Sequence, residues 1–283
     1  AKTLFPYTTL FRSPREFIKL VLNNIGSETE STTMLTLLRQ LVTTANTFVA
    51  PEFRESVITQ IGAGLLKLAR EAKPGSDAQL QFVKFFAVFA NSPELLDELA
   101  DLRDGKLKLD GLKIDADLTW ELLAGLVVGG RADGDAIDRQ LALDNTSNGQ
   151  KAAAGARAML PTAGDKEIAW HTLTQTHELS NILVDAASLG FVRVADADLL
   201  KPFVNQYFEN AVRIWNSNTF KIAEYLIENL YPLPLASKEL AETTKIWIND
   251  PAIKEIPALR RILVESLANV DRALQAQKRD IQN

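Results

Sequence analysis

The sequence contains no cysteine and only two histidines among its 283 residues. Without cysteine, the chain can form neither a disulfide framework nor a thiolate metal site. No apolar run approaches the roughly 20 residues that cross a membrane, and we recognise no secretory signal peptide before Pro14. These absences favour a reducing environment, and we expect a cytoplasmic protein.

An excess of charge of one sign is also lacking. The net charge is −5, and lysine, arginine, aspartate and glutamate are interspersed along the chain. Surfaces that bind nucleic acid or anionic lipid carry a basic patch, which this pattern does not provide. We therefore expect neither nucleic acid nor a membrane as a partner.

Apolar residues make up 46% of the chain, enough for a sizeable core. They recur at spacings of three and four, as in Leu35, Leu38 and Leu41, which is typical of amphipathic helices. Proline, glycine and capping residues interrupt this period and predict roughly a dozen helices of about 10 to 20 residues. The predicted breaks are Pro51, 73–76, Ser92-Pro93, Asp104-Gly105, 161–164, Leu189-Gly190, 231–234 and Asp250-Pro251.

The segment 106–114 is the only strand-like piece, because its leucines partly alternate with polar residues around Asp110-Gly111. We interpret it as a short hairpin or an extended link. Helices joined in pairs by short turns, with a unit of about 40 residues, predict an all-α fold. Its architecture would be an α-solenoid of the HEAT or armadillo kind, built from paired antiparallel helices.

The sequence His177-Glu178-Leu179-Ser180-Asn181 resembles the zinc motif H-E-x-x-H but ends in Asn181. The motif needs a second imidazole one helical turn after the first, and an amide is a poor zinc ligand. His171 lies six residues before His177, so on a helix the two rings would point to different faces. A hydrolase using His171, His177 and Glu178 is therefore our least favoured alternative.

Several acidic and glycine-containing pairs have a structural explanation. Acidic side chains at predicted helix starts cap free N–H groups, and Asp133-Gly134-Asp135 lacks the rest of a calcium loop. Neither glycine pair follows a strand as a nucleotide-binding loop would, so we expect packing and C-capping roles. The pairs are Asp115 with Asp117, Asp133 with Asp135 and Asp138, Asp196 with Asp198, Gly62 with Gly64, and Gly129 with Gly130.

The four tryptophans, Trp120, Trp170, Trp215 and Trp247, fall on predicted helices with apolar neighbours. We expect core packing, with the lining of a ligand-binding surface as the alternative. Arg260-Arg261 is expected to form solvated or inter-helix ion pairs, although one guanidinium could face a substrate carboxylate.

The first residues have a different origin. Thr3 to Ser13, TLFPYTTLFRS, matches the in-frame translation of a widely used sequencing adapter. We interpret residues 1–13 as an assembly artefact, expect them to be disordered, and exclude them from fold reasoning. The authentic protein would then continue upstream of Pro14.

An ordered series of motifs from Pro14 to the C-terminus resembles the C-terminal helical domain of aminopeptidase N, a zinc peptidase family of which the actinobacterial type is the nearest match. The departure is Thr119, where such relatives usually carry arginine. The series comprises Gly111–Trp120, Gly130–Asp138, Asp144–Gly149, Lys166–Trp170, Tyr231-Pro232, Arg260-Arg261, Asp271–Leu274 and Arg279-Asp280.

The resemblance implies that residues 14–283 are such a domain, incomplete at its N-terminal edge. Its partners would be its own upstream catalytic domain, which holds the zinc, and the peptide substrates in a shared chamber. The domain would be a curved bowl of paired helices that caps the catalytic cleft and restricts access to it. We name no catalytic, cofactor-binding or metal-binding residue, and expect no cofactor in this chain. The alternative is a free-standing helical scaffold that binds a protein partner.

Overall fold

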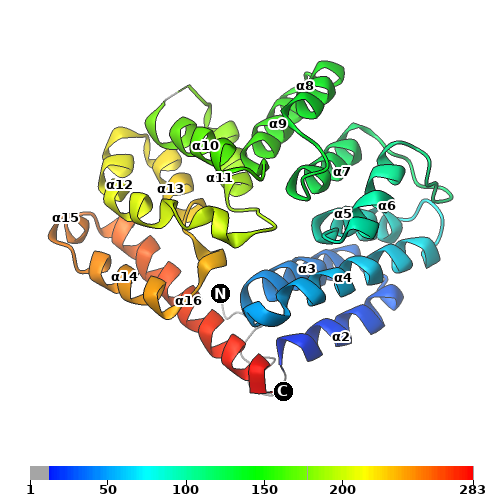
Figure 1. Cartoon of the computed structure of the whole chain (residues 1–283), viewed down its shortest axis with the longest axis horizontal. Helices are drawn as coiled ribbons and strands as arrows, with labels where there is room; N and C mark the ends of the chain where they lie inside the picture. The colour runs from blue at the N-terminus through cyan, green and yellow to red at the C-terminus, as the bar shows by residue number, and fades with distance from the viewer. Residues whose placement is uncertain (1–12, 177, 283) are drawn as a thin grey trace. The chain divides into compact units, whose positions relative to one another are not determined.

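The computed structural model describes residues 13–176 and 178–282, which form α-helices connected by short links (Figure 1). No β-strand occurs in these two ranges, and the predicted all-α class is confirmed. Short 3₁₀ or π turns, η1 to η4, span Ile25–Ser27, Thr44–Phe48, Ala197–Leu200 and Leu233–Leu235. The α-helices are α2 Pro14–Asn24, α3 Ser31–Thr43, α4 Pro51–Glu71, α5 Asp77–Phe89, α6 Pro93–Arg103, α7 Ala116–Val128, α8 Gly134–Leu143, α9 Ser147–Met159, α10 Ala163–Gln175, α11 Asn181–Phe191, α12 Phe203–Ser217, α13 Phe220–Asn229, α14 Lys238–Ile248, α15 Pro251–Lys254 and α16 Pro257–Gln282.

Hydroxyl side chains mark several helix starts, as their sequence positions predict. Ser92 accepts a hydrogen bond from the backbone N–H of Leu95, and Pro93 follows as the first residue of α6. Ser13 and Glu16 form a reciprocal capping box at α2. Ser13 ends the segment that we assigned to the adapter, yet it is buried and caps α2. Residues 1–12 lie outside the described part of the chain.

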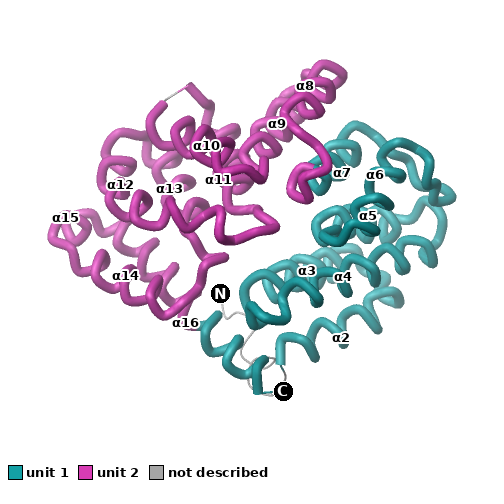
Figure 2. Tube along the Cα trace, viewed as in Figure 1, with its two compact units in different colours: residues 1–126, 272–283 teal, residues 127–271 magenta. Residues whose placement is uncertain are grey.

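The chain divides into two compact units, residues 1–126 with 272–283 and residues 127–271 (Figure 2). In unit 1, α4 packs against α5, and the fully buried rings of Phe82, Phe86 and Phe89 lie in the core. A Cβ atom on Gly62 of α4 would lie 2.8 Å from the carbonyl oxygen of Phe89. The prediction that Gly62 serves close packing is therefore confirmed.

The 106–114 link is an irregular connection and not a hairpin. The backbone N–H groups of Lys106 and Leu107 both donate to the carbonyl of Asp101, at 2.9 Å each. The buried side chain of Gln79 donates to the carbonyl of Asp110 at 3.2 Å. These backbone groups are thus engaged by the end of α6 and by a side chain of α5, which leaves no ladder for a strand to form.

Unit 2 has a layered helical-repeat arrangement. Helix α9 packs most extensively on α11, and α11 packs on α13, so alternate helices in the sequence are neighbours in space. The contact between α9 and α11 is very close, because a Cβ atom on Gly190 would lie 2.3 Å from the carbonyl oxygen of Gly155. The predicted break at Leu189-Gly190 lies within two residues of the end of α11 at Phe191. Gly190 also serves close packing, which the sequence did not predict.

No helix in the described part of the chain combines the length and apolar character needed to cross a membrane.

Candidate functional site

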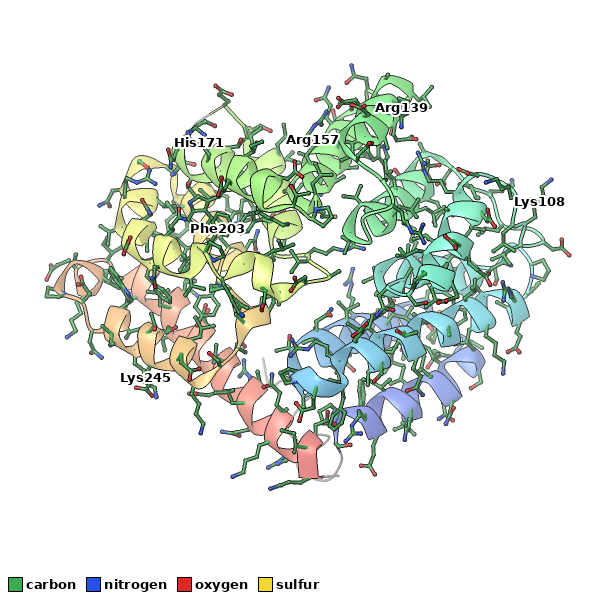
Figure 3. All side chains as sticks on the ribbon, viewed as in Figure 1. Lys108, Arg139, Arg157, His171, Phe203 and Lys245 are labelled. Carbon is green, nitrogen blue, oxygen red and sulfur yellow. The ribbon has the colours of Figure 1, made fainter. Side chains whose placement is uncertain are left out.

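The region that resembles a zinc motif does not have the geometry of one. Helix α10 ends at Gln175 and α11 begins at Asn181, so Glu178 lies in the link between them. A zinc motif needs both ligands on one continuous helix turn. His177 lies outside the described residues, and His171 is exposed on α10 (Figure 3). Among the described residues, no group of three His, Cys, Asp or Glu side chains is placed to hold a metal ion.

One member of each acidic group caps a helix start, as predicted. Asp115 accepts from the N–H of Leu118 at 2.8 Å, and Asp133 accepts from the N–H of Ala136 at 2.9 Å. Asp196 accepts from the N–H of Asp198 at 2.9 Å. These bonds satisfy donors that a helix start leaves free. The loop at Asp133 is therefore explained by capping.

The tryptophans divide into buried and half-buried pairs. Trp120 and Trp170 are buried, which confirms core packing for both. Trp170 contacts Phe191 and Phe203, with ring centroids 5.7 Å and 5.3 Å away. Phe203, labelled in Figure 3, belongs to α12 and brings that helix into the same cluster.

Trp215 and Trp247 are half-buried. Each has one ring partner: Trp215 meets Phe220 edge-on at 5.5 Å, and Trp247 stacks on Phe208 at 6.0 Å. Both belong to unit 2, so the rings stabilise local helix contacts.

The two arginines that begin α16 differ from each other. Arg261 forms an exposed ion pair with Glu265 at 3.0 Å, as a solvated pair would. Arg260 donates through Nε to the carbonyl oxygen of Ile248 at 3.3 Å, at the last residue of α14. The second contact joins two helices through a backbone acceptor, whereas the sequence predicted an inter-helix ion pair.

Unit 2 contains a groove that the sequence did not predict. It has a volume of about 390 Å³ and lies among α8, α9, α10 and α11. Such a volume is in the range of small-molecule and side-chain pockets, about 300 to 1,000 Å³. The apolar residues that line it include Leu141, Ala154, Leu160, Ile168, Leu173 and Leu183.

The charged side chains at this groove are already paired. Arg157 of α9 forms an ion pair with Asp138 of α8, and Thr162 donates to Asp165 (Figure 3 labels Arg157). No serine, cysteine or histidine is among the described residues that line the groove. The groove is therefore suited to binding apolar groups and has no nucleophile of these kinds.

Lys166 holds the helices beside this groove in place. Its side chain is fully buried, and its ammonium donates to the carbonyl oxygens of Ala158 at 2.6 Å and Phe191 at 2.9 Å. These carbonyls lie at the C-terminal ends of α9 and α11, where a cation is favoured. Burial lowers the pKa of Lys166 to about 8, against a smaller opposite effect of Asp165. One feature of the sequence indicates that Lys166 is buried: it lies four residues before Trp170, so the two share a face of the helix.

Comparison with known proteins extends over nearly the whole chain. Residues 11–272 match the family described as ERAP1-like C-terminal domain. The Aminopeptidase N of Streptomyces lividans is 34% identical over 266 residues, which cover 94% of this chain and 31% of that protein. The chain thus spans about a third of the length of this curated relative.

Proposed function

Because this chain belongs to the ERAP1-like C-terminal domain family, we propose that it is the C-terminal domain of an aminopeptidase N-like peptidase. The observation that carries the proposal is the match with Aminopeptidase N over 94% of this chain. The parent enzyme would remove N-terminal residues from peptides. This chain would supply a helical domain and no reacting group.

The domain would cover the catalytic cleft of its parent as a HEAT-like array and restrict which substrates enter. The described residues offer no set of metal ligands, so they do not fit a zinc ion, which residues outside this chain would hold. The groove among α8 to α11 offers an apolar surface without a serine, cysteine or histidine among its described lining residues. We place the parent in the cytoplasm.

The first test is the activity of the purified chain. We expect it to fold and to release no product from a leucine anilide substrate, with or without added zinc. Turnover that a chelator abolishes would contradict the assignment of a non-catalytic domain. Trace contamination by a host aminopeptidase is controlled by an identical purification from cells that carry the empty vector.

A second test identifies the parent. Sequencing the source locus upstream of the codon for Pro14 should reveal an open reading frame that continues into an H-E-x-x-H motif. A stop codon there, or a start codon with its ribosome-binding site, would instead support the free-standing helical scaffold.

The access role is tested on the full-length parent. We expect that it cleaves a leucine anilide and short peptides but spares the N-terminal residue of a folded protein. Equal rates on a short peptide and on a folded protein with the same N-terminal residue would refute the restriction of access, while leaving the peptidase assignment intact.

A further inference from the structure

A basic hollow lies in unit 2 where the short helix α15 turns into α16. Its volume is about 590 Å³, and Lys254, Pro257, Arg260, Arg261 and Val264 line it. Every ionisable residue in this lining is a cation, although the chain as a whole has a net charge of −5. The local charge is therefore opposite to the overall charge.

Two of the three cations are available to a ligand. Arg260 uses only its Nε atom, which donates to the carbonyl of Ile248 and holds the guanidinium in place. Lys254 is exposed, and its backbone N–H donates to the carbonyl of Asp250, whereas its ammonium has no hydrogen-bond or ion-pair partner within the described ranges. Arg261 is paired with Glu265, and it also interacts electrostatically with Glu228. Lys254 and Arg260 together thus present two uncompensated positive charges.

We propose that this hollow binds a phosphate group, as free phosphate or as a small phosphomonoester. A phosphate carries about −1.5 to −2 charges at neutral pH, which matches the two available cations. A single carboxylate would leave one of them unneutralised. The guanidinium of Arg260 still has its terminal nitrogens to donate in the planar fork that suits phosphate oxygens.

The start of α16 adds to this preference. Its first turn contains no acidic residue, and Pro257, its first residue, lines the hollow. The positive end of a 26-residue helix therefore lies at the same region, with no carboxylate in its own first turn. The proposal stands on the side chains, and the helix end strengthens it. It does not depend on the peptidase function.

Thermal unfolding of the full chain tests the proposal, with phosphate added at constant ionic strength. A ligand that binds only the folded state raises Tm in a saturable manner. We expect such a rise with inorganic phosphate and with methyl phosphate, and none with added chloride. A similar rise with both phosphates indicates a site for a phosphomonoester, whereas a rise with inorganic phosphate alone indicates a site for the free ion.

Two variants locate the site. Lys254→Gln removes an exposed side chain without a described partner, so the protein should fold normally and bind phosphate about two- to five-fold more weakly. Arg260→Gln should abolish the phosphate-dependent rise, although it also removes the bond to Ile248. Lys151→Gln on the exposed surface of α9 is the matched control and should leave the rise unchanged.

Three results would overturn the proposal. The first is the absence of a saturable rise in the unmodified protein. The second is an equal loss of affinity in the Lys151→Gln and Lys254→Gln variants, which would indicate general screening. The third is a larger rise with acetate or citrate than with phosphate, which would indicate a carboxylate site.

Discussion

Arg15 and Asp280 are 265 positions apart in the sequence and form an ion pair with a distance of 3.0 Å between Nε and Oδ1. The second carboxylate oxygen of Asp280 accepts from the backbone N–H of Ala50 at 3.0 Å. The guanidinium of Arg15 also lies 4.0 Å from the ring centroid of Phe53. A single carboxylate thus joins the beginning of α2, the beginning of α4 and the end of α16 within unit 1.

Replacing Asp280 should destabilise unit 1. The Asp280 side chain is fully buried, so Asp280→Asn removes a charge that Arg15 requires and turns an amide donor toward another donor. We expect a loss of about 3 kcal/mol in the free energy of unfolding, because removing one member of a buried ion pair leaves the other charge without a partner. Urea denaturation, monitored by circular dichroism, measures this loss of stability.

The control for Asp280→Asn is Glu242→Gln, which breaks the exposed pair with Lys245 (Figure 3). This substitution should change the free energy of unfolding by no more than about 0.5 kcal/mol, as for most surface ion pairs. Similar losses in the two variants would refute a special role of Asp280.

The buried Lys166 should make stability rise with pH. Its folded-state pKa of about 8 lies below the ordinary value of 10.5, so between these values the unfolded state binds more protons. The free energy of unfolding should therefore increase above pH 8, by about 1.4 kcal/mol per pH unit between the two pKa values. Below pH 8 both the folded and the unfolded state hold the proton, so Lys166 no longer makes the free energy of unfolding depend on pH.

Lys166→Met isolates that contribution from other titrating groups. The difference in unfolding free energy between the protein and this variant, measured from pH 7 to pH 9.5 in urea, should grow in favour of the unmodified protein. A difference that stays constant with pH would show that Lys166 titrates normally. The variant should also be less stable at every pH, since the carbonyls of Ala158 and Phe191 lose their donor.

Tyr231 should make the stability of the fold decrease with pH above pH 10, whereas Lys166 makes it increase at lower pH. Burial raises the pKa of Tyr231 to about 12, and its hydroxyl contacts Thr244 Oγ1 at 2.7 Å. Above the ordinary value of 10.0 the unfolded state loses the phenolic proton first, so stability should fall from pH 10 to pH 12. Tyr231→Phe should lessen this alkaline loss in urea titrations, and an identical alkaline profile would contradict the prediction.

Gly190 and Gly164 provide a matched pair of glycine substitutions in unit 2. A Cβ atom on Gly190 would lie 2.3 Å from the backbone oxygen of Gly155, so Gly190→Ala must push α9 and α11 apart. We expect a loss of about 3 kcal/mol or more in unfolding free energy. Gly164 in α10 has no atom within 4 Å of the same position, so Gly164→Ala should stabilise by about 0.5 to 1 kcal/mol. Equal effects would contradict the close packing.

Local chemistry accounts for the parts of the fold that were predicted correctly. Ser92-Pro93 and Asp133 start helices because capping depends on a few neighbouring residues. The break at Leu189-Gly190 was predicted for the same reason and lies within two residues of the end of α11 at Phe191. Only the backbone oxygen of Gly155, 35 positions away, reveals the packing role of Gly190.

The amino-acid sequence by itself determined the all-α class, most helix ends and the capping role of Asp115, Asp133 and Asp196, because these depend on contacts between neighbours in the chain. The tertiary structure alone decided which helices pack together and that Lys166 and Asp280 are buried. It also decided the two sites of unit 2, the groove among α8 to α11 and the basic hollow between α15 and α16. Those features arise between residues that are distant in sequence, and the period of a helix does not specify its partner. The same charged residue type is solvated in Lys245 and buried in Lys166, and only packing distinguishes them.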